Sequence, residues 1–168
     1  MITTLLCLAF PLLLIYAAWH DVSTMTIPNW VSIVLGLAFI PAAFAAGLSV
    51  EQIGLHLVFG AGVLILCAAL FYLNVFGGGD AKVIAAASLW TGLAASAPFV
   101  MGMAIAGGAL AGVLIVLRRM KVQSDKPWLA RLMSPEEGAP YAVAIAVGAL
   151  LAAPSSPVLA AGLAGISA

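Results

Sequence analysis

The feature that most constrains this chain is a stretch of 37 residues, from 81 to 117, in which Lys82 is the one charged side chain. A helix rises about 1.5 Å per residue, so a crossing of the hydrocarbon core of a bilayer takes about 20 residues. The stretch is too long for one crossing, and it is too apolar for water. We therefore expect it to fold back on itself, with the turn between Gly92 and Pro98.

The rest of the chain repeats this pattern. Of its 168 residues, 65% are hydrophobic and 7% are charged, whereas about a quarter of the residues in a soluble domain are charged. Such a chain must be solvated by lipid. We expect an all-α polytopic membrane bundle of about six transmembrane helices, forming a single domain over residues 1–168. The expected spans lie at 2–19, 30–47 and 53–73, twice within 81–117, and from 139 onward, where Pro154 and Pro157 kink or end the last one.

The basic residues give this bundle an orientation, because Lys and Arg are retained on the cytoplasmic side of a membrane. With six spans, all of them fall on one side, which places the polar loop 118–138 inside and the amino terminus outside. Asp21 and Asp80 then both lie on the cytoplasmic side. The net charge is zero, which gives no indication of nucleic-acid binding. The basic residues are Lys82, Arg118, Arg119, Lys121, Lys126 and Arg131.

Two of the six acidic residues lie at the edge of an apolar run. Asp21 ends the first run and Asp80 begins the fourth, and acids at membrane depth are costly and tend to be functional. There are simpler interpretations: Asp21 marks the end of a span, and Asp80 is the N-cap of a helix. The other acids lie in loops, Glu51 outside and Asp125, Glu136 and Glu137 within 118–138.

A pair of carboxylates on one face has a clear chemical use. Two that lie close together share a proton, so that the ionised one can take a proton from water and the protonated one can give a proton to a peptide carbonyl. Gly77, Gly78 and Gly79, directly before Asp80, allow backbone conformations that are closed to other residues and let a substrate backbone approach. The alternative for these glycines is a flexible turn.

The remaining polar and aromatic residues fit structural roles. Lys82 follows Asp80 by about 200° around a helix, so we expect it to reach lipid headgroups, with substrate binding as the alternative. His20 and His56 are expected at different depths and make a poor metal pair. Cys7 and Cys67 are interpreted as small buried hydrophobic residues. The four tryptophans are interpreted as anchors at the membrane interface; they are Trp19, Trp30, Trp90 and Trp128.

Three groups of residues in this order resemble a known family. They are His20-Asp21 with Ile27-Pro28-Asn29, then Gly77-Gly78-Gly79-Asp80-Ala81-Lys82, and finally the segment from Gly138 to Ala146 with Pro140-Tyr141. The combination resembles the type IV prepilin peptidases, which are bacterial G-x-G-D aspartic proteases of the inner membrane.

The resemblance implies an enzyme that removes the basic leader of a prepilin or pseudopilin at the cytoplasmic membrane face. Asp21 and Asp80 are then the catalytic pair, and no cofactor or metal is expected. The partners are the substrate and membrane lipid, and the sequence does not indicate an oligomeric state. The residues expected to support the site or the substrate are Gly77, Gly79, Lys82, Pro28 and Asn29.

One departure from the family narrows the expectation. Larger members carry paired Cys-x-x-Cys motifs in a cytoplasmic part and methylate the new amino terminus of the pilin, and this chain has no such motif. It is therefore similar to the short, peptidase-only, CpaA/TadV-like branch of tight-adherence (Flp) pilus systems, with an archaeal preflagellin peptidase as a related alternative. The rival interpretations are a small proton-coupled transporter using the same carboxylates and an assembly subunit in which the acids are only caps.

Overall fold

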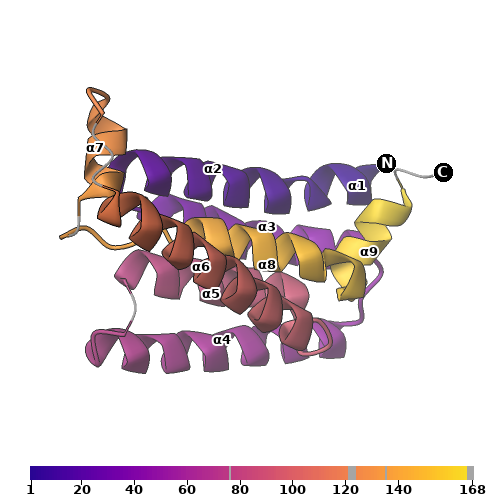
Figure 1. Ribbon diagram of the computed structural model, residues 1–168. Helices are drawn as coiled ribbons and strands as arrows, with labels where there is room; N and C mark the ends of the chain where they lie inside the picture. The colour runs from indigo at the N-terminus through magenta and orange to yellow at the C-terminus, as the bar shows by residue number, and fades with distance from the viewer. Residues whose placement is uncertain (76, 121–123, 135, 166–168) are drawn as a thin grey trace.

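The structure is a computed structural model that describes residues 1–75, 77–120, 124–134 and 136–165, and this part of the chain is helical without a strand. Its helices lie roughly side by side, with the amino terminus and α9 at one end of the bundle and the short helix α7 at the other (Figure 1). The elements are α1 (Ile2–Cys7), α2 (Ala9–Thr24), α3 (Asn29–Ala45), α4 (Val50–Tyr72), α5 (Gly78–Thr91), α6 (Ser96–Arg119), α7 (Pro127–Met133), α8 (Ala142–Ala152), the 3-10 turn η1 (Ala153–Ser155) and α9 (Pro157–Ala164).

The fold class expected from the sequence is confirmed. Among the described residues, three helical stretches are long and apolar enough to cross a membrane, namely Ile2–Thr24, Val50–Tyr72 and Ser96–Arg119. A fourth candidate is Ala142–Ser155 with Pro157–Ala164, which is bent by 75° at the prolines that the sequence singled out. Helices also occupy the other two expected segments, but α3 and α5 are shorter, so six spans and an outside amino terminus stay predictions.

The ends of the helices follow from local chemistry. α4 begins with a capping box, in which the Ser49 hydroxyl accepts from the Gln52 N–H and the Gln52 amide oxygen accepts from the Ser49 N–H. α5 ends at Gly92, whose φ of +61° suits glycine, and the chain then reverses into α6. The turn expected between Gly92 and Pro98 is therefore confirmed, although Ser96 already begins the next helix.

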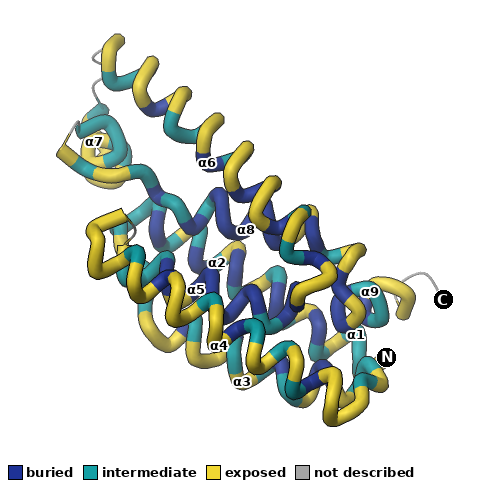
Figure 2. Tube along the Cα trace, turned by 90° about the horizontal axis from the view of Figure 1, so that it is seen from below, coloured by how far each residue is buried: buried dark blue, intermediate teal, exposed yellow. Residues whose placement is uncertain are grey.

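The buried centre of the bundle is built around α5 and α8. Buried side chains concentrate there, whereas much of α4 and the outer side of α6 are exposed, as expected for surfaces that face lipid (Figure 2). α6 and α8 cross at close range, since a Cβ at Gly148 would lie 2.5 Å from the Met103 nitrogen. Small residues allow such close crossings in membranes.

The expectation that Trp90 is an anchor at the membrane interface is wrong. Trp90 lies fully buried between Phe10 and Phe39 instead of at the interface, and its indole N–H donates to the Leu35 carbonyl at 2.8 Å. Cys7 and Cys67 are buried free thiols, as expected. The other three tryptophans are substantially exposed, namely Trp19, Trp30 and Trp128.

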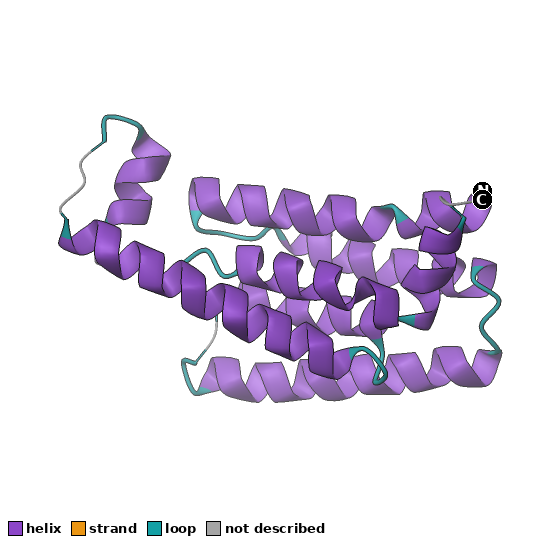
Figure 3. Ribbon diagram, turned by 45° about the vertical axis from the view of Figure 1, so that its right-hand side comes forward, coloured by secondary structure: helices purple, strands orange, loops and turns teal. Residues whose placement is uncertain are grey.

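Arg118, near the end of α6, binds the polar segment that follows this helix. Arg118 donates to the Leu132 carbonyl and, through Nη2, to the Gly138 carbonyl at 2.8 Å. α7 lies at this end of the molecule, where it contacts α2 and α6 (Figure 3). The segment and the starts of α5 and α8 thus lie at the same end of the molecule (Figure 1).

Candidate active site

The two acids singled out in the sequence line one cleft at the α7 end of the bundle. The cleft has a volume of about 320 Å³ and lies between the last turn of α2, the α2–α3 connection and the first turn of α5. The cleft also contains Asn29, Gly77 and Gly79, which were expected to support the site. The full lining is Asp21, Met25, Thr26, Ile27, Asn29, Gly77, Gly78, Gly79 and Asp80. Pro28, the remaining expected residue, is the N-cap of α3 and positions Asn29 as its first residue.

Asp21 is held by a contact far away in sequence. Its side chain is 6% exposed, and Oδ2 accepts the backbone N–H of Ala142 at 3.0 Å. Ala142 is the first residue of α8, and the N-terminus of a helix attracts a negative charge. Asp21 therefore does more than end its helix, because it also ties the last turn of α2 to the start of α8.

Asp80 is positioned by its own helix. It is the third residue of α5, whose N-cap is Gly77, so the interpretation of Asp80 as the N-cap is wrong. Instead, the carboxylate accepts the backbone N–H of Gly77, as the acid of a capping box does. Asp80 remains partly exposed on the cleft side. It can therefore meet water or a substrate from there.

The electrostatic environment of Asp80 differs from that of an ordinary surface acid. Asp80 lies outside the three helices long enough to span a membrane. Burial, and then the negative charge of Asp21, raise its pKa from 3.8 to about 6, against a lowering by the Gly77 hydrogen bond. Asp21 is thus close enough for its charge to raise the pKa of Asp80.

The glycines before Asp80 act through size and not through unusual backbone angles. Gly77 has a φ of −68°, and Gly78 and Gly79 lie in the first turn of α5, so the expectation of special backbone conformations is wrong. A Cβ at Gly77 would lie 3.0 Å from Asp80 Oδ2, and one at Gly79 would lie 3.2 Å from Ile27 Cβ. The absent side chains leave room for the carboxylate and let the α2–α3 connection pack onto α5.

His20 braces the α2–α3 connection, which forms one wall of the cleft. Its Nδ1 donates to the Thr26 carbonyl at 2.8 Å and lies 2.9 Å from Thr24 Oγ1. Met25 between them has a φ of 56°, and its N–H bonds back to the Asp21 carbonyl. His56 lies elsewhere and donates to the Leu89 carbonyl. Within the described ranges, no three metal-binding side chains cluster.

Lys82 links the two sequence motifs. Its Nζ donates to Asn29 Oδ1 at 2.8 Å, which joins the start of α5 to the start of α3 beside the cleft. The sequence placed Lys82 off the face of Asp80, and it did not reveal this bond because Asn29 precedes Lys82 by 53 positions. The side chain is exposed, so it is also accessible to a ligand.

A polytopic helical bundle with two acids in one cleft defines a class of membrane protein that includes several hydrolases and transporters. The comparison with protein families decides between them, because residues 8–113 match the family described as the type IV leader peptidase family. This match covers more than half of the chain and includes Asp21 and Asp80, so the chain belongs to that family. Neither the search of curated proteins nor the search of solved structures gives a match.

The family supports a leader-peptidase-like protease and gives no support to the transporter alternative. It indicates prepilin-type substrates in general terms. The matched region ends before the segment from Gly138 to Ala146, so the likeness of that segment to the family rests on the sequence motif.

Proposed function

We propose that this protein is an aspartic endopeptidase that removes leader peptides from prepilin-type substrates, with Asp21 and Asp80 as its catalytic pair. The single observation that supports this most is that the two carboxylates line one cleft and interact by charge. The family match is consistent with it.

The reaction follows from the protonation of the pair. Asp21, beside the N-terminus of α8, is the ionised base, and Asp80 carries the shared proton. The base takes a proton from a water molecule, the water oxygen bonds to the scissile carbonyl carbon, and Asp80 gives its proton to the carbonyl oxygen. The intermediate then collapses: the C–N bond breaks, the leaving nitrogen takes the proton held by the base, and the hydroxyl proton returns to Asp80.

We place the active site at the cytoplasmic face of a bacterial inner membrane. The basic residues of α6 and of the segment after it lie at the same end as the cleft, and basic residues are retained inside. We further propose the CpaA/TadV-like branch of tight-adherence pilus systems, because residues 1–168 carry no Cys-x-x-Cys motif. The leader is the basic segment before the apolar helix of the pilin.

The test is co-expression with a prepilin-type substrate, followed by a gel shift for leader removal. Asp21→Asn and Asp80→Asn should each lower cleavage by about 10³-fold or more while the protein still inserts, because each removes one half of the acid–base pair. Glu51→Gln is the matched control, since Glu51 is an exposed acid in the first turn of α4, and it should cleave normally. Normal cleavage by either aspartate variant would contradict the proposal.

A further inference from the structure

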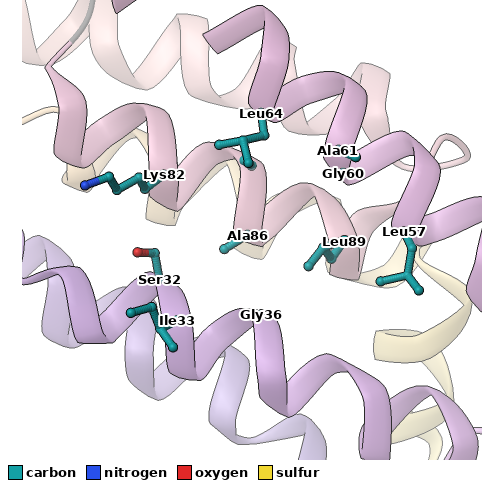
Figure 4. A pocket seen from close by; sticks show the side chains of 11 residues that line it. Ser32, Ile33, Gly36, Leu57, Gly60, Ala61, Leu64, Lys82, Ala86 and Leu89 are labelled. Carbon is teal, nitrogen blue, oxygen red and sulfur yellow. The ribbon is translucent and has the colours of Figure 1, made fainter. Parts of the chain in front are cut away.

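A second concavity, separate from the catalytic cleft, lies between α3, α4 and α5. It is an open groove of about 380 Å³ (Figure 4). Lys82 and Ser32 lie toward one end, and Leu57 and Leu89 toward the other. We call it the α3–α5 groove. Its lining consists of Ser32, Ile33, Gly36, Leu57, Gly60, Ala61, Leu64, Lys82, Ala85, Ala86 and Leu89.

The shape of this groove suits a helix. Small residues from each of the three helices, Gly36, Ala61 and Ala86, line it, while exposed large apolar side chains such as Ile33 and Leu64 form its edges. In a membrane, helices associate where small residues let their backbones approach closely. Between Lys82 and Leu89, α5 rises about 10 Å, which matches two turns of a helix lying along it.

The groove and the catalytic cleft meet at one hydrogen-bonded pair. Lys82 lines the groove and donates to Asn29, and Asn29 lines the cleft. Asp80 precedes Lys82 by two residues on the same helix. A chain that leaves the cleft past the Lys82–Asn29 pair therefore reaches the groove.

The charge at the mouth of the groove indicates the polarity of its occupant. Lys82 is the one charged residue that lines it, and within the described part of the chain its ammonium group donates to a neutral amide instead of a carboxylate. An occupant with a carbonyl or carboxylate acceptor at its cleft end, followed by apolar residues, matches both the cation and the apolar walls.

We propose that the α3–α5 groove binds the first two turns of the apolar helix that follows the cleavage site in a membrane-anchored substrate. The inference rests on the proposed function, since it concerns how that same site selects its substrate. The groove aligns the substrate helix with α5, so that the peptide bond just before the helix lies beside Asp21 and Asp80.

The test fills the groove and compares two substrates. Gly36→Leu projects into the groove, where its Cβ would lie 3.7 Å from Leu89 Cδ1, an ordinary contact. Gly62→Leu is the matched control, because Gly62 is an exposed helical glycine outside the groove with nothing within 4 Å of a Cβ. The substrates are the membrane-anchored prepilin and a short peptide that spans the cleavage site but lacks the apolar helix.

Filling the groove should lower kcat/KM for the anchored substrate about tenfold more than for the short peptide, since only the anchored substrate needs the groove. Gly62→Leu should give the wild-type ratio of the two substrates. Equal losses on both substrates, or no loss on the anchored one, would overturn the proposal.

A photocrosslinking measurement separates the substrate from a lipid occupant without turnover. A photoreactive side chain at Ala61, in the Asp80→Asn background, should capture the apolar helix of the prepilin, whereas one at Gly62 should not. Adducts with lipid alone at both positions would overturn the proposal. A failure of the proposed function would look different, because cleavage would then persist in Asp21→Asn and Asp80→Asn.

Discussion

The polar groups at the two ends of α5 lie in opposite environments. At its start, Asp80 is partly exposed, borders a cleft and shares its environment with a second acid. At its end, the Leu89 carbonyl accepts from His56, the Trp90 carbonyl accepts from Ser156, and Trp90 is fully buried. The second end is thus closed, with both of these carbonyl groups paired, whereas the first leaves a carboxyl group partly exposed beside a cleft. We infer that the contacts at the closed end help to hold α5, and with it Asp80, in place.

Apart from the loss of either aspartate, the largest expected effect is the dependence of cleavage on pH at the cleft end. Because the pKa of Asp80 is raised to about 6 and we propose that its proton is needed, kcat/KM should fall about 50-fold between pH 6 and pH 8. The measurement is a kcat/KM profile in detergent. A profile that is flat between these values would remove Asp80 as the proton donor.

The same pKa gives a prediction for stability. The folded protein holds the Asp80 proton more tightly than the unfolded chain, so the contribution of this group to the free energy of unfolding falls as pH rises from about 4 to 6 and is flat above 6. Asp80→Asn should lack this decline. Unfolding midpoints measured at pH 4, 5, 6 and 7 for both proteins provide the comparison.

At the closed end, Gly92→Ala should cost about 2–4 kcal/mol of stability. Gly92 has a φ of +61° and a ψ of −175°, and a Cβ there would lie 2.5 Å from His56 Cε1, so the substitution combines backbone strain with a clash. Gly47→Ala is the control, because it has a φ of +81° but open space, and it should cost about 1 kcal/mol. Equal losses in thermal unfolding would show that the contact with His56 contributes nothing.

Ser156→Ala should cost about 1–3 kcal/mol at the same end. The hydroxyl donates to the Trp90 carbonyl and caps α9 by accepting the Leu159 N–H, so its loss leaves buried groups unpaired. Activity per folded molecule should stay at the wild-type level. Ser96→Ala, which loses a local bond at an exposed site, should change stability by less than about 0.5 kcal/mol.

The smallest expected effect concerns the link beside the cleft. Asn29→Ala removes the acceptor of Lys82 and should lower kcat/KM about two- to fivefold, since an exposed hydrogen bond to a charged group contributes little. Gln52→Ala removes an amide at the far end of the bundle and should leave the kinetics unchanged. A loss of 100-fold in Asn29→Ala would instead place Asn29 in direct contact with the reacting groups.

Hydropathy and charge predicted the helical class, the apolar segments and the turn at Gly92, because each depends on residues close together in sequence. Trp90 escaped prediction, since an aromatic residue near a helix end looks the same whether it meets lipid or packs between Phe10 and Phe39. The number of spans also could not be fixed from apolar length. α3 and α5, with 17 and 14 residues, fall short of a full crossing although their segments are apolar.

Some features of the candidate site could likewise be predicted from the sequence, and others could not. The motif identified Asp21 and Asp80, and the cleft brings them together. The bond between Asp21 and the Ala142 N–H joins residues 121 positions apart, and a backbone donor leaves no mark in the sequence. Steric room at Gly77 and Gly79 also depends on Ile27 and on the Asp80 rotamer, so the sequence indicated small residues there but not the reason for them.

The close crossing of α6 and α8 fixes the position of α8 relative to the cleft. Gly148 seats α8 against α6 about 9 Å along the helix from Ala142, whose N–H holds the Asp21 carboxylate. A larger side chain at position 148 cannot fit without sliding or lifting α8, and either motion carries the donor away from Asp21. The position of the Asp21 carboxylate thus depends on the contact between Gly148 and α6, which involves neither of the two acids.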